Sequence, residues 1–442
     1  METIYTISTV IFLVVVLLSL YIYYSKSGNI FNPWFIISSL SILDVYIPAV
    51  IRLVNKELNV YASWMSHLDE TDIIYGVIVY FIGWVFFSLG YFLSKKMKFG
   101  GEGKYERYIS IKRTRNLLIF SLSFLLLYFY LTLSFFGGVS NYILISLSER
   151  FNNTVELPYY LSMLGQVKIM AMSIVFISSS LIFSSDLIKK RYPRLRFTLI
   201  FICLAVAFTT LFRGTILNFL LGFGALTAYI INKNNIGTGK RDLKNLSRKV
   251  VLIAVGLFIV VGASRTLYIA RNVSEINNVS FSFVNEINKN LTGSSLLGVS
   301  SIVKYYGEDS DRLFMGKTIT DMLLMPVPRS IYPSKPEWYG IDDITRKMGW
   351  PETTQSATSI QGELFANFSY PGLVLMILFG CIFGIFSKWS EKNIINASLY
   401  SFVVIPATLT TFWMSTTGLI NALKFLPFIY LLLFAFSSKR LD

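Results

Sequence analysis

The sequence predicts an all-α, polytopic integral membrane protein with about 11 transmembrane helices and one large extracytoplasmic loop. Three observations lead to this prediction: 54% of the 442 residues are hydrophobic, only 15% are charged, and the mean hydropathy is +0.57. A soluble chain of this length needs far more charge to cover its surface. The 37 Phe and 26 Tyr suit a protein whose membrane interfaces carry aromatic rings.

Eleven apolar stretches are each about long enough to cross a ~30 Å hydrocarbon layer. They run near 4–23, 34–53, 73–93, 117–136, 162–184, 195–212, 214–232, 249–268, 371–387, 395–414 and 419–436. The first has no positive segment before it, which favours a retained span over a cleaved signal. The apolar run 195–232 is too long for one crossing, so we expect it to fold back at Arg213-Gly214. Three regions follow: 1–268 with helices 1 to 8, a loop at 269–370, and 371–442 with helices 9 to 11.

Lys and Arg predict the orientation. The dense basic clusters follow odd-numbered spans and lie at Lys95–Arg115, Lys189–Arg196 and Lys233–Lys249. The 54–72 link is acidic instead. By the positive-inside rule the N-terminus is outside and the C-terminus is cytoplasmic. Most of the net charge of +15 is then a membrane anchor, and no nucleic-acid partner is expected.

The 269–370 loop is too long to be a plain connector. It holds an amphipathic stretch at 313–325, and then four prolines within 326–336. We name residues 326–336 the proline strap, because this proline density predicts a stiff, extended segment with few backbone donors.

Several basic residues lie at the predicted outer boundary, where the positive-inside rule does not require them. They are Arg52, Lys168, Arg213, Arg265, Arg271 and Lys424. Charge at that depth is costly unless it is paired or functional. Snorkelling or a local salt bridge is the simpler explanation for any single one. As a set, they indicate a site for an anion such as a lipid-linked phosphate or pyrophosphate.

The acidic and metal-binding candidates are few. Asp44 lies near the middle of span 2, where a carboxylate is either functional or paired with a neighbouring helix. His67, the only histidine, lies in the acidic outer link and is most simply an exposed titrating side chain. Asp309-Ser310-Asp311 resembles a DxD motif, which chance explains in so acidic a loop. We expect no metal and no cofactor.

The end of the large loop resembles a known family. Pro328-Arg329-Ser330-Ile331-Tyr332-Pro333-Ser334-Lys335-Pro336, then Gly362-Glu363-Leu364-Phe365-Ala366-Asn367-Phe368 and Gly372, resemble the oligosaccharide repeat-unit polymerases (O-antigen polymerases, Wzy type). The motif-level likeness covers about fifty residues, and the remaining likeness is architectural. Arg213 with Gly224, and Arg329 with Gly340, match an Arg-x10-Gly spacing described for this family.

The resemblance implies a GT-C-like glycosyltransferase of the bacterial cytoplasmic membrane. It would build O-antigen or capsule by moving the growing glycan from its undecaprenyl-pyrophosphate carrier to an incoming lipid-linked unit. Its partners would be these lipid-linked oligosaccharides, the bilayer, a chain-length regulator and a flippase. The pyrophosphate leaving group calls for preorganised positive charge. Arg329 is the catalytic candidate for that charge, and the binding candidates are Arg213, Arg265, Arg271, Lys168, Arg52, Lys335 and Lys424. Glu363 is the first candidate for the general base, with Asp44 and His67 behind it.

Two other functions stay open. A ligase would move finished glycan to another acceptor with the same donor chemistry. Such ligases typically rely on a loop histidine, and 269–370 has none. A lipid-linked oligosaccharide flippase would favour polar residues through the bundle and repeated halves, whereas only Asp44 and Lys168 lie deep here.

Overall fold

The computed structural model describes the chain in segments. These are residues 2–27, 29–55, 68–97, 107–139, 141–142, 159–184, 193–208, 213–234, 244–245, 248, 294–307, 309–324, 331–334, 340–350, 359–410, 412 and 426–439. The chain divides into two compact units. Unit 1 comprises Met1–Phe99, Gly262–Lys388 and Ala407–Leu423, and unit 2 comprises Gly100–Val261, Trp389–Pro406 and Lys424–Asp442.

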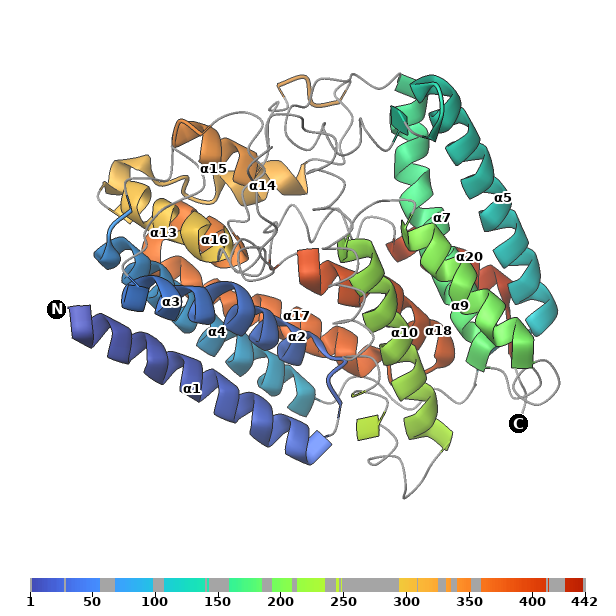
Figure 1. Cartoon of the computed structure of the whole chain (residues 1–442), viewed down its shortest axis with the longest axis horizontal. Helices are drawn as coiled ribbons and strands as arrows, with labels where there is room; N and C mark the ends of the chain where they lie inside the picture. The colour runs from blue at the N-terminus through green and yellow to red at the C-terminus, as the bar shows by residue number, and fades with distance from the viewer. Residues whose placement is uncertain are drawn as a thin grey trace, which may run out of the picture. The chain divides into compact units, whose positions relative to one another are not determined.

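Unit 1 begins with three long apolar helices. Helix α1 runs over Glu2–Ser27 (Figure 1). The second is continuous from α2 (Pro33–Ser41) through a π-helix (Ile42–Tyr46) into α3 (Ile47–Asn55). The third is α4 (Glu70–Lys96), whose first turn is closed by a capping box between Asp69 and Asp72.

Helix α17 (Met376–Trp389) packs closely against α4 through glycines. A Cβ atom at Gly90 would collide with the carbonyl of Ile377, and one at Gly380 would collide with the carbonyl of Phe87. Small residues allow membrane helices to approach in this way. At the far end of this contact, Lys388 Nζ donates to the carbonyl oxygen of Lys95 at 2.9 Å, which satisfies a terminal acceptor of α4.

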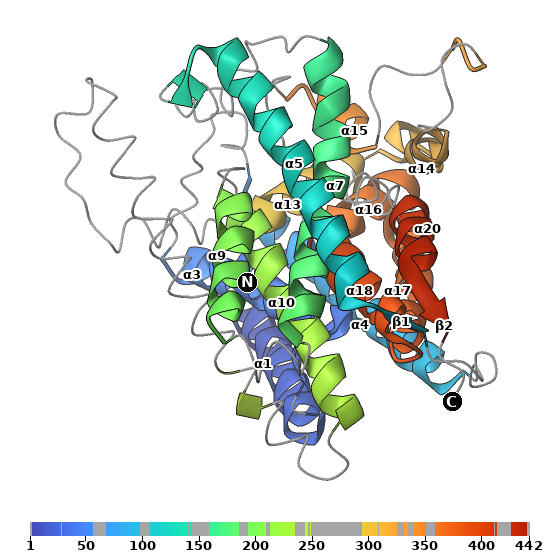
Figure 2. The same ribbon diagram turned by 90° about the vertical axis from the view of Figure 1, so that its right-hand side faces the viewer.

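Unit 2 is a second group of apolar helices: α5 (Ile111–Phe136), α7 (Tyr159–Ser184), α9 (Pro193–Phe208), α10 (Arg213–Asn234), α18 (Ile394–Leu399) with the π-helix Tyr400–Val404, and α20 (Leu426–Phe436). Helices α5 and α7 lie side by side along their length (Figure 2). The predicted break in the 195–232 run is confirmed, because α9 ends at Phe208 and α10 begins at Arg213.

The described residues are almost entirely helical, as predicted, and the exception is one short two-stranded ladder. Strand β1 (Arg107–Ile109) pairs antiparallel with β2 (Ser437–Lys439), with Tyr108 opposite Ser438. The link after span 3 and the C-terminal tail therefore lie on the same side of the protein. The charge pattern predicts the same arrangement, with both segments cytoplasmic.

Within the described residues, five helices are long and apolar enough to cross a membrane: Thr3–Ser27, Pro33–Val54, Glu70–Lys96, Lys112–Phe136 and Ser359–Trp389. Shorter apolar helices cover Val167–Ile182, Ile394–Thr410 and Leu426–Ala435. The protein is a helical membrane protein. The predicted span at 249–268 lies outside the described residues, and the total of eleven spans stays a prediction.

The large loop contains helices: α13 (Ser294–Gly307), a 3-10 turn (Ser310–Arg312), α14 (Lys317–Leu323), α15 (Ile341–Lys347) and α16 (Ser359–Gly372). Helix α13 packs against α4 and α16 and is buried over most of its length (Figure 1). Part of the segment predicted to be an outer loop therefore belongs to the core of unit 1.

Candidate functional site

Helix α16 is broken within its last turns. Ser369 has φ 55° and ψ −149°, which are not helical values, and Pro371 follows it. Gly372 then packs against the carbonyl of Leu364, so the chain turns back on itself. Residues 359–368 are therefore a half-helix, and the apolar stretch 359–389 is not one straight span.

Helix α13 runs antiparallel to α4, and its contacts show how far along α4 each end of α13 lies. Lys304 Nζ pairs with Asp72 Oδ2 at 2.7 Å in the first turn of α4, and Ser300 faces Gly76 one turn further on. Ser295, at the other end of α13, reaches Asp44 in the middle of the helix 33–55. Ser295 and Lys304 are nine residues apart, so the N-terminal end of α13 lies about 13.5 Å along α4 from Asp72, at 1.5 Å per residue.

Asp44 caps this buried helix end. Its Oδ2 accepts hydrogen bonds from the backbone N–H of Ser295, at 3.3 Å, and from the Ser295 hydroxyl. An acid at a helix N-terminus satisfies orphan donors and complements the helix dipole. Asp44 lies in the π-helix and is partly exposed. Of the two roles predicted for Asp44, pairing with a neighbouring helix is observed, and such pairing does not preclude a functional role.

The surroundings of Asp44 are polar and buried. Its neighbour Tyr80 is fully buried on α4, and the electrostatic environment of the Tyr80 hydroxyl includes Asp44, Ser295 and Ser359. Within the described residues, Tyr46 Oη and Gln361 Oε1 are buried without a hydrogen-bond partner. Gln361 packs against Gly83, so the first turn of α16 lies at a similar depth to the first turn of α13.

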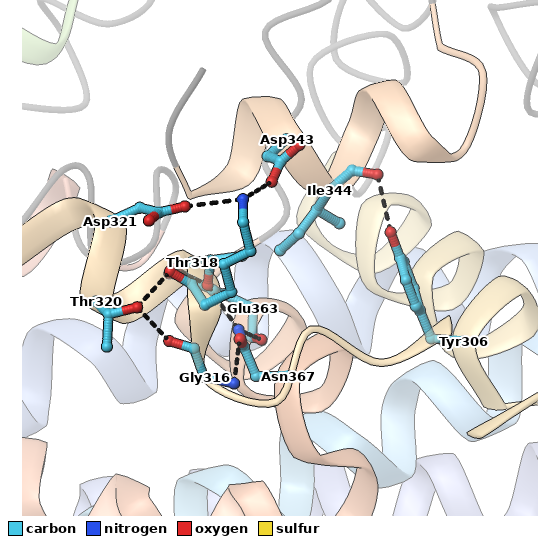
Figure 3. Close-up of polar contacts among 10 residues, drawn as sticks. Tyr306, Gly316, Thr318, Thr320, Asp321, Asp343, Ile344, Glu363 and Asn367 are labelled. Atoms are coloured by element: carbon cyan, nitrogen blue, oxygen red, sulfur yellow. Dashed lines mark hydrogen bonds and ion pairs between the residues drawn. The ribbon is translucent and has the colours of Figure 1, made fainter. Parts of the chain in front are cut away.

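Glu363 lies in a second buried cluster, further along α16 (Figure 3). Its Oε1 accepts a hydrogen bond from the Thr318 hydroxyl at 2.9 Å. Asn367 Nδ2 donates to Thr318 Oγ1 at 2.7 Å and to the Glu363 carbonyl oxygen at 2.8 Å. Glu363, Thr318 and Asn367 are each 0% exposed, and we name these three residues the buried triad.

An ion-pair cluster lies beside the buried triad, on α14 and α15 (Figure 3). Lys317 Nζ contacts Asp321 Oδ2 at 2.9 Å and Asp343 Oδ2 at 3.2 Å. The hydrogen bond to Asp321, followed by the charge of Asp343, raises the pKa of Lys317. Lys317 therefore keeps its positive charge throughout the physiological pH range, and it connects α14 with α15.

Backbone strain gathers around α16. Among the described residues, the non-glycine residues with positive φ are Met315 (49°), Ser359 (54°) and Ser369 (55°). Ser359 and Ser369 mark the two ends of the half-helix, and the N–H of Met315 bonds to the carbonyl oxygen of Asn367. Such conformations are costly and concentrate at functional sites, which supports α16 as the centre of the candidate site.

The predicted basic residues are only partly described. Arg52 is buried in α3 of unit 1. In unit 2, Lys168 Nζ lies 4.8 Å from the ring centroid of Tyr128, and Arg213 begins α10. The others, together with His67, lie outside the described residues: Arg265, Arg271, Arg329, Lys335 and Lys424. The outer basic site therefore stays a prediction.

Sequence reasoning named Asp44 and Glu363 as candidates and did not predict their partners. Asn367 follows Glu363 by four residues, so both lie on one helix face, and this spacing could have indicated it. Thr318 and Ser295 are distant in sequence and carry no local signal. In the described part of the chain, no three His, Cys, Asp or Glu residues could hold a metal ion.

The fold and the site define a helical membrane protein in which two short helices, α13 and residues 359–368 of α16, carry buried polar groups beside the spanning helices. We name these two short helices the half-helices. A comparison of the chain with protein-family models, with curated proteins and with solved structures finds no match.

Proposed function

We propose that the chain is a GT-C-like membrane glycosyltransferase that polymerises undecaprenyl-pyrophosphate-linked oligosaccharide units. In each cycle a hydroxyl oxygen of the incoming unit attacks the anomeric carbon that joins the growing glycan to its carrier. The bond from that carbon to the pyrophosphate breaks, and the carrier leaves as undecaprenyl pyrophosphate. Energy comes from the donor bond, so no nucleotide site is required.

The observation that carries the proposal is the placement of the two candidate carboxylates. Asp44 and Glu363 both lie at the half-helices of unit 1, and Glu363 belongs to the segment that resembles the polymerases. Carboxylates buried in membrane proteins are expensive and mark function by default. The reaction needs such a group, because the attacking hydroxyl must lose a proton.

Asp44 fits the role of proton acceptor better than Glu363. It is partly exposed and lies in a π-helix, a feature frequent at functional sites. Glu363 is 0% exposed and its carboxylate is engaged by Thr318. The positive charge for the leaving pyrophosphate is assigned to Arg329.

The test is a reconstitution. Purified protein in proteoliposomes is given the lipid-linked glycan extracted from a strain that lacks the gene, with an Asp44→Asn preparation as the matched control. A ladder of longer lipid-linked glycans, absent with the control, supports polymerisation. Transfer to an added non-carrier acceptor without a ladder supports the ligase alternative. Absence of any new glycosidic bond contradicts a transferase of either kind.

One observation favours a flippase as the second candidate. Transporters often place substrate and ion sites at discontinuous helices near the bilayer midplane. The N-terminal ends of α13 and α16 both lie beside the interior of α4 and carry polar side chains. A flippase would move the lipid-linked unit across the proteoliposome membrane and form no bond, so the same preparation separates the two functions.

A further inference from the structure

We propose that Thr318 and Asn367 are positioning residues that act with Glu363 to lock α14 onto the half-helix α16. This inference rests on the proposed function, because the chain between α14 and α15 contains the proline strap and its Arg329. The lock and the Lys317 ion pairs fix α14 and α15, the helices where that chain begins and ends.

Three hydrogen bonds join the members of the buried triad. Thr318 Oγ1 donates to Glu363 Oε1 and accepts from Asn367 Nδ2, so both functions of the hydroxyl are used. Asn367 donates its second amide hydrogen to the Glu363 carbonyl oxygen. Because all three side chains are 0% exposed, water cannot replace a lost partner, and leaving a member unpaired is costly.

The same residues fix the backbone that leads into α14. Phe314 N–H donates to the carbonyl oxygen of Ala366 at 3.1 Å, and Met315 N–H donates to that of Asn367 at 3.0 Å. Gly316 N–H donates to Asn367 Oδ1 at 3.0 Å. The break in α16 frees carbonyl groups that would otherwise accept within the helix, and the 314–316 backbone satisfies them. The broken helix α16 and the segment 314–316 are therefore held together by backbone and side-chain hydrogen bonds.

The lock extends to α15 through the residue next to Thr318. Lys317 bonds to Asp321 on its own helix and to Asp343 on α15. Helix α15 is held from a second side, because the hydroxyls of Tyr305 and Tyr306 on α13 donate to the carbonyl oxygens of Lys347 and Ile344 at 2.8 and 3.1 Å. The half-helices and α14 and α15 thus share one bonded network.

The lock makes predictions that a catalytic role for Glu363 does not. A Gln at position 363 still offers an oxygen to the Thr318 hydroxyl, whereas a Leu does not. Thr320 supplies a matched control: it lies on the same helix, but it is exposed and its hydroxyl bonds only to the carbonyls of Gly316 and Lys317 (Figure 3).

The experiment is hydrogen exchange on the full-length protein in nanodiscs, read at peptides covering 313–318 and normalised to peptides of α4. Thr318→Val and Glu363→Leu should each speed exchange there about tenfold or more, because a buried partner is lost. Thr318→Ser, Glu363→Gln and Thr320→Val should retain wild-type exchange. If Thr318→Val yields too little protein, Asn367→Asp replaces it, since this change removes both amide donors.

Wild-type exchange in Thr318→Val and Glu363→Leu would overturn the lock, and so would equal acceleration in Thr320→Val. The polymerisation assay then tests the positioning role. Thr318→Val should lower polymer length, and Thr318→Ser should restore it. Faster exchange with unchanged polymer length would overturn positioning and leave the proposed function intact. If even the wild-type protein forms no polymer, the proposed function fails, and exchange alone decides whether the lock exists.

Discussion

The half-helix region of unit 1 and the α5–α7 pair of unit 2 differ in helix length and in the polar groups that they bury. Helices α5 and α7 are each 26 residues long, and Lys168 of α7 lies against the ring of Tyr128 on α5. Helices α13 and α16 are 14 residues each, and they bury Asp44's partner Ser295 and the triad of Glu363. Continuous apolar helices need no polar partners, whereas half-helices must satisfy exposed backbone ends with side chains.

This difference indicates where function resides. Burial of polar groups costs free energy unless they are hydrogen-bonded. The half-helix region carries that cost at several positions, together with backbone strain at Ser359 and Ser369. Among its described residues the α5–α7 pair has no non-glycine residue with positive φ, and its buried polar side chains are Ser and Thr hydroxyls with no carboxylate among them. We therefore expect substitutions to affect activity strongly in the first region and weakly in the second.

The largest effect is expected at Asp44. Asp44→Asn retains an oxygen to accept from Ser295 but cannot take a proton at neutral pH, so polymerisation should fall by about 10²–10⁴-fold with normal protein yield. Polymer formation per mole of reconstituted protein measures it. Asp309→Asn, in the 269–370 loop, is the control, because the Asp309 side chain is 43% exposed. Equal activity of Asp44→Asn and wild type would remove Asp44 as the proton acceptor.

The second effect concerns Arg329, which lies outside the described residues. If Arg329 stabilises the leaving pyrophosphate, Arg329→Ala should slow polymerisation by about 10²–10³-fold, the usual cost of losing a donor aimed at developing charge. Arg329→Lys should rescue only part of this loss, because it retains the charge without the bidentate fork. Arg248→Ala, in a predicted cytoplasmic cluster, is the control. Full-length polymer from Arg329→Ala at normal abundance would contradict this role.

The sequence predicted the long apolar helices 3–27, 33–54, 70–96 and 112–136, because apolar runs reflect the surrounding lipid. It did not predict that α13 and the first part of α16 are buried. Helix α13 is rich in Ser and Gly and is too short to read as a span. Its decisive contact, Ser295 to Asp44, joins residues 251 positions apart. The Thr318–Glu363 bond likewise joins residues 45 apart. Such pairings depend on tertiary packing, which local periodicity does not encode.

The third effect concerns packing in unit 1. Gly90→Val places a branched side chain against the backbone of α17, so the two helices must separate. Overpacking of this kind costs about 1–3 kcal/mol. A lower melting temperature and a smaller monodisperse fraction in size-exclusion chromatography should follow. Leu89→Val, at a neighbouring side chain that is 48% exposed, should change neither. Unchanged melting of Gly90→Val would mean that α4 and α17 pack less closely than described.

The smallest effect is expected at Lys168, and it tests the expectation that substitutions in the α5–α7 pair affect activity weakly. The ammonium group lies 4.8 Å from the ring centroid of Tyr128, a contact worth about 0.5–1 kcal/mol at partly exposed sites. Lys168→Met retains the apolar stem and removes the charge, so melting should shift slightly and polymerisation should change by no more than about fivefold, which is the same energy expressed as a rate. Tyr128→Leu should produce a similar shift in melting, and the double variant should add little to either single change, because both remove one interaction.

A loss with Lys168→Met as large as that of Asp44→Asn would show that unit 2 also contributes to substrate binding, as the outer basic residues predict. The half-helix region and the α5–α7 pair would then differ in helix architecture but not in their contribution to function.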